Sequence, residues 1–420
     1  MVAKFFKYLQ MLGIVPNLAS LCKKVQFYFK SYKVSIREKV SSYTTVNHVV
    51  VESTLWVHAV PFIIDDKKYL RLNTSRWTAV KTICAIGSLV IQLTLILKWF
   101  QIQKSKSRAV VFTDSWRQIL MTFFLDLFIG ACFGLLHLLR VPREIVFLLN
   151  CSNYLERDHQ GKGVHGYVPN YFIGIAVLAI ITVTAAPVTL CATGFLKPCM
   201  PPSFFTMATL PCKDWNDIRG YFLAKTVQAV FAAYTGLVIF STLAFGLFVL
   251  LYYPVAVQLL LLDGLKRYLD QEKSFRMILL VQYRKLQLLS RLLNNAWRDP
   301  AMPFVVGGIL VLNSTSLYVV LSSSEKIPLP VLAIYSVGAV DTLVMIQHLF
   351  KIVSYPYTRS VDFINAARRG LKKASRWEVK YIVSCFPLKV HMGNGTFFDR
   401  STSLVVCNTA LDLLVTFLLL

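Results

Sequence analysis

The feature that most limits how this chain can fold is a set of seven apolar runs, each long enough to cross a membrane. A helix needs about 20 largely apolar residues to span a hydrocarbon layer of about 30 Å. With 55% hydrophobic residues and a mean hydropathy of +0.56, the chain carries more apolar surface than one soluble core can hold. We therefore expect an all-α, polytopic membrane protein with seven transmembrane helices. The runs are Thr78–Phe100, Ile119–Leu139, Tyr171–Leu196, Phe222–Leu251, Pro303–Leu321, Val331–Val353 and Ser401–Leu420.

The fourth apolar run is the longest, because it continues beyond Leu251 to about Leu265. That length exceeds one membrane thickness but is too short for two spans joined by a turn. We expect one long fourth helix that projects from the bilayer. The sequence shows no internal repeat and no low-complexity linker. We therefore predict one seven-helix domain, residues 78–420, preceded by a cytoplasmic N-terminal segment, residues 1–77.

The basic residues are distributed unevenly between the two sides of the membrane. If the N-terminus is cytoplasmic, that side carries segments 1–77, 140–170, 252–299 and 354–400, which hold 33 Lys and Arg residues. The loops on the opposite side hold 7. Positive charge accumulates on the side that is not translocated. The charge distribution therefore predicts a cytoplasmic N-terminus.

Two of the cytoplasmic segments have apolar residues at three- and four-residue spacing opposite basic residues, which is the pattern of amphipathic helices. They cover about residues 272–298 and about residues 360–382. Basic amphipathic helices can lie on anionic lipid. They can also pack together, and against neighbouring subunits, as a cytoplasmic anchor bundle. The sequence leaves both arrangements open, and we expect the bundle.

Neither composition nor motifs indicate an enzyme or a nucleic-acid partner. The net charge of +24 is spread between apolar runs, whereas nucleic-acid binding clusters basic residues on soluble modules. We find no metal-ligand spacing, phosphate-binding loop, nucleophile elbow or dinucleotide fingerprint. We therefore expect no catalytic residue, no metal and no cofactor, and membrane lipids as partners.

The nine cysteines form an odd set that lies mostly in or beside apolar runs, which is not the pattern of a small disulfide scaffold. Cys199 and Cys212 differ, because they flank a Pro-rich turn in loop 197–221, on the side predicted to be outside. An oxidising compartment favours a disulfide between them. Two free thiols are the alternative.

Three acidic residues, Asp126, Asp341 and Asp412, lie inside the predicted spans. A carboxylate within a bilayer normally faces a cavity, a partner or water. Asp126 and Asp341 fit either a structural polar pair or an ion site. Asp412 shares one stripe of the last helix with Thr409 and Thr416, as a pore-lining helix requires. In a symmetric oligomer Asp412 would form an acidic ring that favours cations, whereas a polar contact within one subunit is the alternative.

Aromatic residues in the second, third and fifth spans are weak candidates for a ligand pocket. Apolar and aromatic walls are compatible with many small organic molecules, so they do not identify a ligand. The same residues also suit packing between helices. The candidates are Phe123, Phe128, Tyr171, Phe172 and Tyr318.

The stretch from Cys385 to Phe398, CFPLKVHMGNGTFF, is followed by a short polar turn and the final span. It resembles the segment that leads into the last helix of arthropod gustatory and odorant receptors, where Pro-Leu precedes a Gly and an aromatic residue. The layout of the chain agrees with this resemblance. An apolar segment with a proline, Trp56–Phe62, precedes the first span, the fourth helix is long, and the cytoplasmic connections are basic.

The terminal signature of that family is Thr-Tyr, five hydrophobic residues and Gln-Phe, and it aligns with the last span of this chain. Thr409 and Phe417 match it. Ala410 and Thr416 replace the Tyr and the Gln, and Asp412 interrupts the hydrophobic residues. The match to the signature is therefore partial.

The resemblance implies a seven-helix receptor in the plasma membrane that assembles as a homo- or hetero-tetramer and works as a ligand-gated, non-selective cation channel. It implies a small organic ligand in a pocket among the outer halves of the second to sixth helices. It also implies a subunit anchor of cytoplasmic helices and a pore lined by the last helix. Carried to this chain, the pore residues are Thr409, Asp412, Leu413 and Thr416. We favour the gustatory over the odorant type.

Two other functions are compatible with a seven-helix chain. A transporter, or a membrane protein without channel activity, would use Asp126 or Asp341 as a proton or ion site, but no pseudo-repeat supports it. A G-protein-coupled receptor would need the opposite orientation. The sequence has no Asp-Arg-Tyr after the third span and no Asn-Pro-x-x-Tyr in the seventh.

Overall fold

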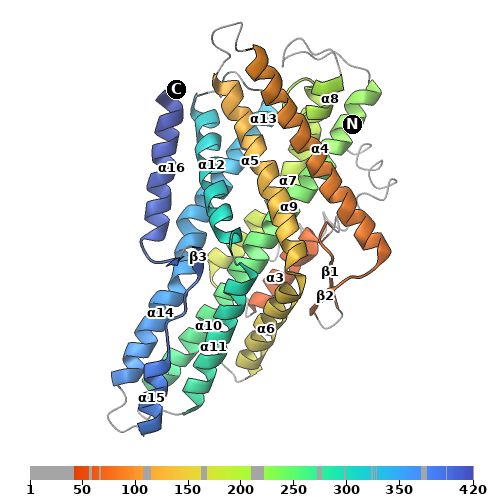
Figure 1. Cartoon of the computed structure of the whole chain (residues 1–420). Helices are drawn as coiled ribbons and strands as arrows, with labels where there is room; N and C mark the ends of the chain where they lie inside the picture. The colour runs from red at the N-terminus through yellow and green to blue at the C-terminus, as the bar shows by residue number, and fades with distance from the viewer. Residues whose placement is uncertain are drawn as a thin grey trace.

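The computed structural model describes residues 42–55, 59–65, 68–106, 115–161, 168–209, 222–271, 277–297, 299–322, 325, 327, 329–369, 376–393 and 395–419. These residues form an elongated helical bundle with two short β-hairpins (Figure 1). α4 (Arg76–Lys106) and α16 (Thr402–Leu419) lie on opposite sides of the bundle in this view.

Seven helices in the described ranges are long and apolar enough to cross a membrane. This confirms the predicted all-α fold with seven spans. Besides the spans in α4 and α16, the bundle contains spans in α5 (Ser115–Arg140), α7 (Asn170–Leu196) and α12 (Ala301–Ser322), and two composite spans, Phe222–Asp270 and Val331–Arg369.

The fourth span is the long helix that the sequence predicts. It runs without interruption through α9 (Phe222–Ala244), the π-helical segment η1 (Phe245–Tyr252) and α10 (Tyr253–Gln271). Every residue from 247 to 260 is buried. A helix that is apolar around most of its circumference belongs in the interior of a bundle, so this helix forms the central core.

The sixth span also extends beyond the thickness of a membrane. It passes from α13 (Leu329–Val344) through the π-helical segment η3 (Met345–Leu349) into α14 (Phe350–Arg369). The helix expected at about 360–382 therefore needs correction, because its first part continues the sixth span and its last part is a separate helix, α15 (Arg376–Ser384). Residues 370–375 lie outside the described ranges.

α10, α11 (Met277–Ala296), α14 and α15 pack together at one end of the molecule as a unit that we call the basal bundle (Figure 1). Leu279, Tyr283 and Phe363 belong to its buried core, and the rings of Tyr283 and Phe363 stack with their centroids 5.1 Å apart. The apolar faces of these helices therefore pack on one another within the chain, as expected for a bundle.

α6 (Pro142–Gly161), a helix that the sequence does not predict, binds the start of α3 (Tyr43–Thr54). The backbone N–H of Thr44 donates to both carboxylate oxygens of Glu156, at 3.1 and 3.0 Å, and the Thr44 hydroxyl donates at 2.7 Å. The Tyr253 hydroxyl donates to the same carboxylate at 3.3 Å. The first N–H groups of a helix lack intrahelical partners and favour an anion. The fully buried Glu156 therefore joins α3, α6 and α10.

α6 also holds a hairpin between α3 and α4. Its strands, β1 (Phe62–Ile64) and β2 (Leu70–Leu72), are antiparallel. The Asn150 side chain accepts a hydrogen bond from the Leu70 N–H at 2.9 Å and donates one to the Leu70 carbonyl at 3.0 Å. Both backbone groups of Leu70 are therefore satisfied by one amide.

The extended segment 385–390 connects α15 to the last span and is held by side chains of α11. The Tyr283 hydroxyl donates to the Phe386 carbonyl at 2.9 Å. The Asn294 amide donates to the Lys389 carbonyl at 2.8 Å. These side chains supply the hydrogen bonds that an extended backbone outside a sheet would otherwise lack.

A hairpin of β3 (His391–Gly393) and β4 (Thr396–Phe397) follows and lies against the start of α12. Gly393 has a φ of +106°, and a Cβ atom there would lie 2.5 Å from Pro303 and 2.7 Å from Asp299. Only glycine combines this backbone conformation with so close an approach. The hairpin therefore sets where the chain enters α16.

Asp399 caps the start of α16. Its Oδ1 atom accepts hydrogen bonds from the backbone N–H and hydroxyl groups of Ser401 and Thr402, at 2.7 to 3.1 Å. The hydrogen bonds from Thr402 and Ser401 hold the pKa of the Asp399 carboxyl below its usual value of 3.8. Asp399 thus satisfies N–H groups at the helix start that have no intrahelical partner.

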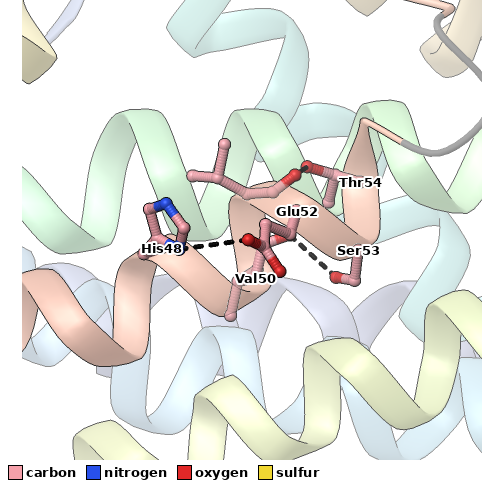
Figure 2. Close-up of polar contacts among 6 residues, drawn as sticks. His48, Val50, Glu52, Ser53 and Thr54 are labelled. Atoms are coloured by element: carbon pink, nitrogen blue, oxygen red, sulfur yellow. Dashed lines mark hydrogen bonds and ion pairs between the residues drawn. The ribbon is translucent and has the colours of Figure 1, made fainter. Parts of the chain in front are cut away.

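We expect Glu156→Ala to destabilise the fold by about 3 kcal/mol, because it leaves the buried backbone N–H of Thr44 without an acceptor and removes the charge-assisted hydrogen bonds from the Thr44 and Tyr253 hydroxyls. Thermal unfolding of the purified chain in detergent, followed by tryptophan fluorescence, measures the effect. Glu52→Gln is the matched control. Figure 2 shows Glu52 on α3 beside His48, with 3.5 Å between His48 Nδ1 and Glu52 Oε1. A half-exposed pair at this spacing contributes about 0.2–0.5 kcal/mol, so equal losses in the two variants would contradict the assignment.

We expect Asp399→Ala to destabilise the start of α16 by about 1 kcal/mol at neutral pH, whereas Asp399→Asn keeps most of the cap. Because the folded-state pKa lies below the usual 3.8, the stabilisation by the carboxylate is fully present above the usual pKa. It is lost as the pH falls through the lower, folded-state pKa. Unfolding temperatures measured between pH 3 and pH 7 test both statements. The same pH dependence in Asp399→Asn as in the native chain would argue against them.

Candidate functional site

A cavity of about 140 Å³ lies among the second to sixth spans. The two π-helical segments line it together, η1 with Phe248 and Tyr252 and η3 with Met345 and Leu349. π-helical turns inside α-helices occur frequently at functional sites. The remaining walls come from α5, α7, α9, α12 and α13. The cavity is almost wholly apolar and joins five of the seven spans.

One carboxylate borders this cavity. Asp341 of α13 accepts a hydrogen bond at Oδ2 from the Thr182 hydroxyl of α7, at 2.7 Å. Its Oδ1 atom is buried and has no hydrogen-bond partner within the described residues. An apolar cavity with one polar anchor can orient a small organic molecule that carries a single hydrogen-bonding or charged group.

The aromatic residues singled out in the sequence are not gathered at this cavity. Phe123 lines it, whereas Phe128 lines a much smaller pocket beside α4 and α9. Phe172 is buried and stacks on Tyr252, with ring centroids 4.9 Å apart. Tyr171 has 47% of its surface exposed.

Tyr318 is also buried, and its ring meets Phe417 of α16 with centroids 6.4 Å apart. The aromatic walls that sequence reasoning missed are Phe240, Phe248 and Tyr252. They belong to the long fourth helix. Its sequence is apolar throughout this region, so it does not distinguish residues that line a cavity from residues that are fully packed.

The two acids of the second and sixth spans lie in different cavities. Asp126 does not border the cavity of Asp341 and instead lines a second one of about 80 Å³ between α5, η1 and α12. A direct Asp126–Asp341 pair is therefore not part of this structure.

α16 packs with one face and exposes the other. Its buried residues include Val406, Ala410 and Leu414, which face α12, η3 and α14. Thr409, Asp412 and Thr416 lie on the exposed face and Leu413 is half-buried. The last helix thus carries a polar stripe that no other part of the described chain covers. The hydroxyls of Thr409 and Thr416 donate to backbone carbonyls one turn earlier.

Three hydrogen bonds tie α16 to elements that line the larger cavity, and one of them runs from the Gln347 amide of η3 to Cys407 Sγ of α16 at 3.1 Å. The Ser314 hydroxyl of α12 donates to the Ala410 carbonyl at 2.8 Å. The Ser403 hydroxyl donates to the Ile346 carbonyl of η3 at 2.8 Å. Because α12 and η3 also line the cavity, these hydrogen bonds can pass a change in the shape of the cavity directly to the last helix.

The loop after α7 contains the short helix α8 (Phe204–Thr209) and the cysteine singled out in the sequence. Cys199 is buried and disulfide-bonded. Its expected partner, Cys212, lies outside the described residues.

Comparison with known proteins finds similarity in structure only. No protein-family model matches the chain, and no curated protein sequence matches it. The insect olfactory receptor OR5 from Machilis hrabei superposes with a TM-score of 0.58 at 12% identity, over 93% of this chain and 98% of the receptor. The same receptor in complex with eugenol superposes with a TM-score of 0.57 at 11% identity, over 90% and 97%. This multi-pass membrane protein therefore has the seven-helix fold of the insect olfactory receptors.

Proposed function

We propose that this chain is a chemosensory receptor of the gustatory type that works as a ligand-gated, non-selective cation channel in the plasma membrane. One observation carries the proposal. α16 exposes a polar stripe while its opposite face is hydrogen-bonded to two walls of an internal cavity. A helix that borders a pore and senses a ligand needs both properties. The preference for the gustatory type rests on the segment Cys385–Phe398 and the partial terminal signature.

The ligand that we propose is a small organic molecule in the larger cavity. A cavity of about 150 Å³ with apolar walls accepts a molecule of the size of benzene, and the volume here is about 140 Å³. The similar receptor OR5 has been solved with eugenol bound, a compound with one aromatic ring. Asp341 and Thr182 would bind the polar group of the ligand.

In this proposal, gating depends on the hydrogen bonds that join the walls of the larger cavity to α16. A ligand that presses on Met345 or Leu349 moves η3, and the Ile346 carbonyl transmits that shift to Ser403. The Ser314–Ala410 hydrogen bond provides a second connection, through α12. A ligand shifts the open–closed equilibrium only by its difference in affinity for the two states, so these walls are where that difference arises.

We propose a tetramer of identical or mixed subunits with the N-terminus in the cytoplasm. Four copies of α16 would then surround the axis, with Asp412 as an acidic ring. The exposed apolar residues Trp377 and Val383 of α15, with 49% and 65% of their surface accessible, support subunit contacts through the basal bundle. The basic segments predicted to be cytoplasmic contain α3, α6, the basal bundle and its connection to α16. The proposal therefore places all of these elements on the same side of the membrane.

Asp412→Asn tests the pore. We expect it to lower the permeability of cations relative to anions and to weaken block by divalent cations, because it removes the charge of the ring. Whole-cell currents in cells that express the chain measure both, and Asp412→Glu, which keeps the charge, should behave like the native chain. An unchanged permeability and block in Asp412→Asn would exclude the acidic ring.

Ala179→Phe tests the ligand cavity. Ala179 of α7 lines the cavity, so the added ring would occupy the space of the ligand. We expect about a tenfold or greater loss of ligand potency, equivalent to about 1.4 kcal/mol, with normal surface expression. Val188→Phe adds a ring to an exposed position of the same helix and should leave potency unchanged. Equal potency in the two variants would place the ligand elsewhere.

A further inference from the structure

The cavity that Asp126 lines is separate from the proposed ligand cavity. It has a volume of about 80 Å³ and lies between α5, the junction of α9 and η1, and α12. Leu127, Leu243, Leu247, Ile309 and Leu312 line both cavities. These apolar side chains form a partition, with Asp341 on one side and Asp126 on the other.

Asp126 has no partner within the described part of the chain. Its Oδ2 atom is buried and makes no hydrogen bond there. On the facing helix, Gly308 leaves room beside the carboxylate, because a Cβ atom at that position would lie 3.9 Å from both oxygens. An ionised carboxylate in an apolar interior needs a cation or hydrogen-bond donors to offset the loss of water.

One wall of the same cavity is a row of four aromatic rings, each beside the next in space. Phe304 stacks on Phe133 with centroids 4.2 Å apart. Phe133 faces His137 at 6.3 Å, and His137 faces Trp297 at 6.3 Å. All four residues line the cavity together with Asp126. The faces of aromatic rings attract organic cations, most strongly where water is excluded.

Two of these rings are fixed in position by hydrogen bonds to backbone carbonyls. His137 Nε2 donates to the Ala296 carbonyl at 2.7 Å, and Trp297 Nε1 donates to the Leu250 carbonyl at 3.3 Å. Rings that are already oriented lose little entropy when a ligand binds. The cavity therefore combines an unpaired carboxylate, an oriented aromatic wall and space for a few heavy atoms.

We propose that this cavity is a second binding site, specific for a small protonated amine. The ammonium group lies against the Asp126 carboxylate, and the carbon skeleton extends towards the stacked rings of Phe133 and Phe304, which are the nearest part of the aromatic wall along α5 and α12. The site goes beyond the proposed ligand-gated function, because it requires neither conduction nor occupation of the larger cavity.

The test is binding to the purified full chain in detergent, measured as a saturable rise in unfolding temperature at pH 7.5. The probe is pyrrolidine, which is protonated at that pH. Tetrahydrofuran has the same five-membered ring without the charge and serves as the neutral control. We expect pyrrolidine to stabilise the chain and tetrahydrofuran to have no effect.

Matched acid variants locate the site. Asp126→Asn should weaken pyrrolidine binding about tenfold or more, because it removes a charge-assisted hydrogen bond, whereas Asp341→Asn should leave it unchanged. Gly308→Val fills the space beside the carboxylate without touching the charge and should also weaken binding. Pyrrolidine binding that Asp341→Asn abolishes and Asp126→Asn leaves intact would overturn the assignment. Equal stabilisation by pyrrolidine and tetrahydrofuran would overturn it as well.

The outcome is independent of the proposed channel. A chain that binds pyrrolidine through Asp126 but passes no ligand-driven current would contradict the channel and leave the amine site in place. A chain that conducts, but whose unfolding temperature pyrrolidine does not change, would contradict only the amine site.

Discussion

A chain in the hydrocarbon layer must satisfy its backbone N–H and C=O groups internally, because no water is present to bond them. In this chain the apolar runs meet that requirement as helices. Outside the seven spans, the extended backbone of segment 385–390 is bonded by side chains of α11. The side chains of Tyr283 and Asn294 donate hydrogen bonds to the carbonyls of Phe386 and Lys389, which in a β-sheet would be bonded by a neighbouring strand. This arrangement carries the chain from α15 back along the basal bundle to the hairpin and the start of α16 (Figure 1). The position of the last helix thus depends in part on hydrogen bonds that α11 of the basal bundle makes with the segment before the hairpin.

The larger cavity lies where two of the spans depart from regular α-helical geometry. η1 and η3 interrupt the regular α-helical geometry of the two composite spans, and both segments line the larger cavity. α16 is bonded to η3 and α12 rather than to the central helix. The proposed gating would therefore need no long pathway, because α12 and η3 both line the cavity and are hydrogen-bonded to the last helix.

Much of this architecture follows from the sequence, because crossing a bilayer depends on length and hydropathy. The seven spans, the long fourth helix and the exposure of Thr409, Asp412 and Thr416 on one face of α16 all agree with the pattern of residues. Helical spacing is less informative for residues 360–382, because the apolar pattern continues from α14 into α15.

The sequence could not identify contacts between residues that are far apart in the chain. Glu156 binds Thr44 across 112 positions, and no local pattern on α6 predicts it. The prediction of Phe128 and Tyr171 as pocket residues rests on their aromatic character, which does not say which neighbour a ring faces. Phe248 and Tyr252 line the cavity from η1, whose π-helical geometry residue spacing does not predict. The separation of Asp126 from Asp341 likewise depends on the partition between the two cavities.

The central claim is that the exposed face of α16 lines a pore that ligand binding opens. Accessibility of single cysteines to a charged, membrane-impermeant thiol reagent during ligand-driven current tests it most directly. Thr416→Cys lies on the exposed face and Leu414→Cys on the face packed within the subunit. A pore along the exposed face predicts rapid, irreversible loss of current in Thr416→Cys and no loss in Leu414→Cys or in the native chain. Modification of Leu414→Cys with Thr416→Cys unaffected would contradict it.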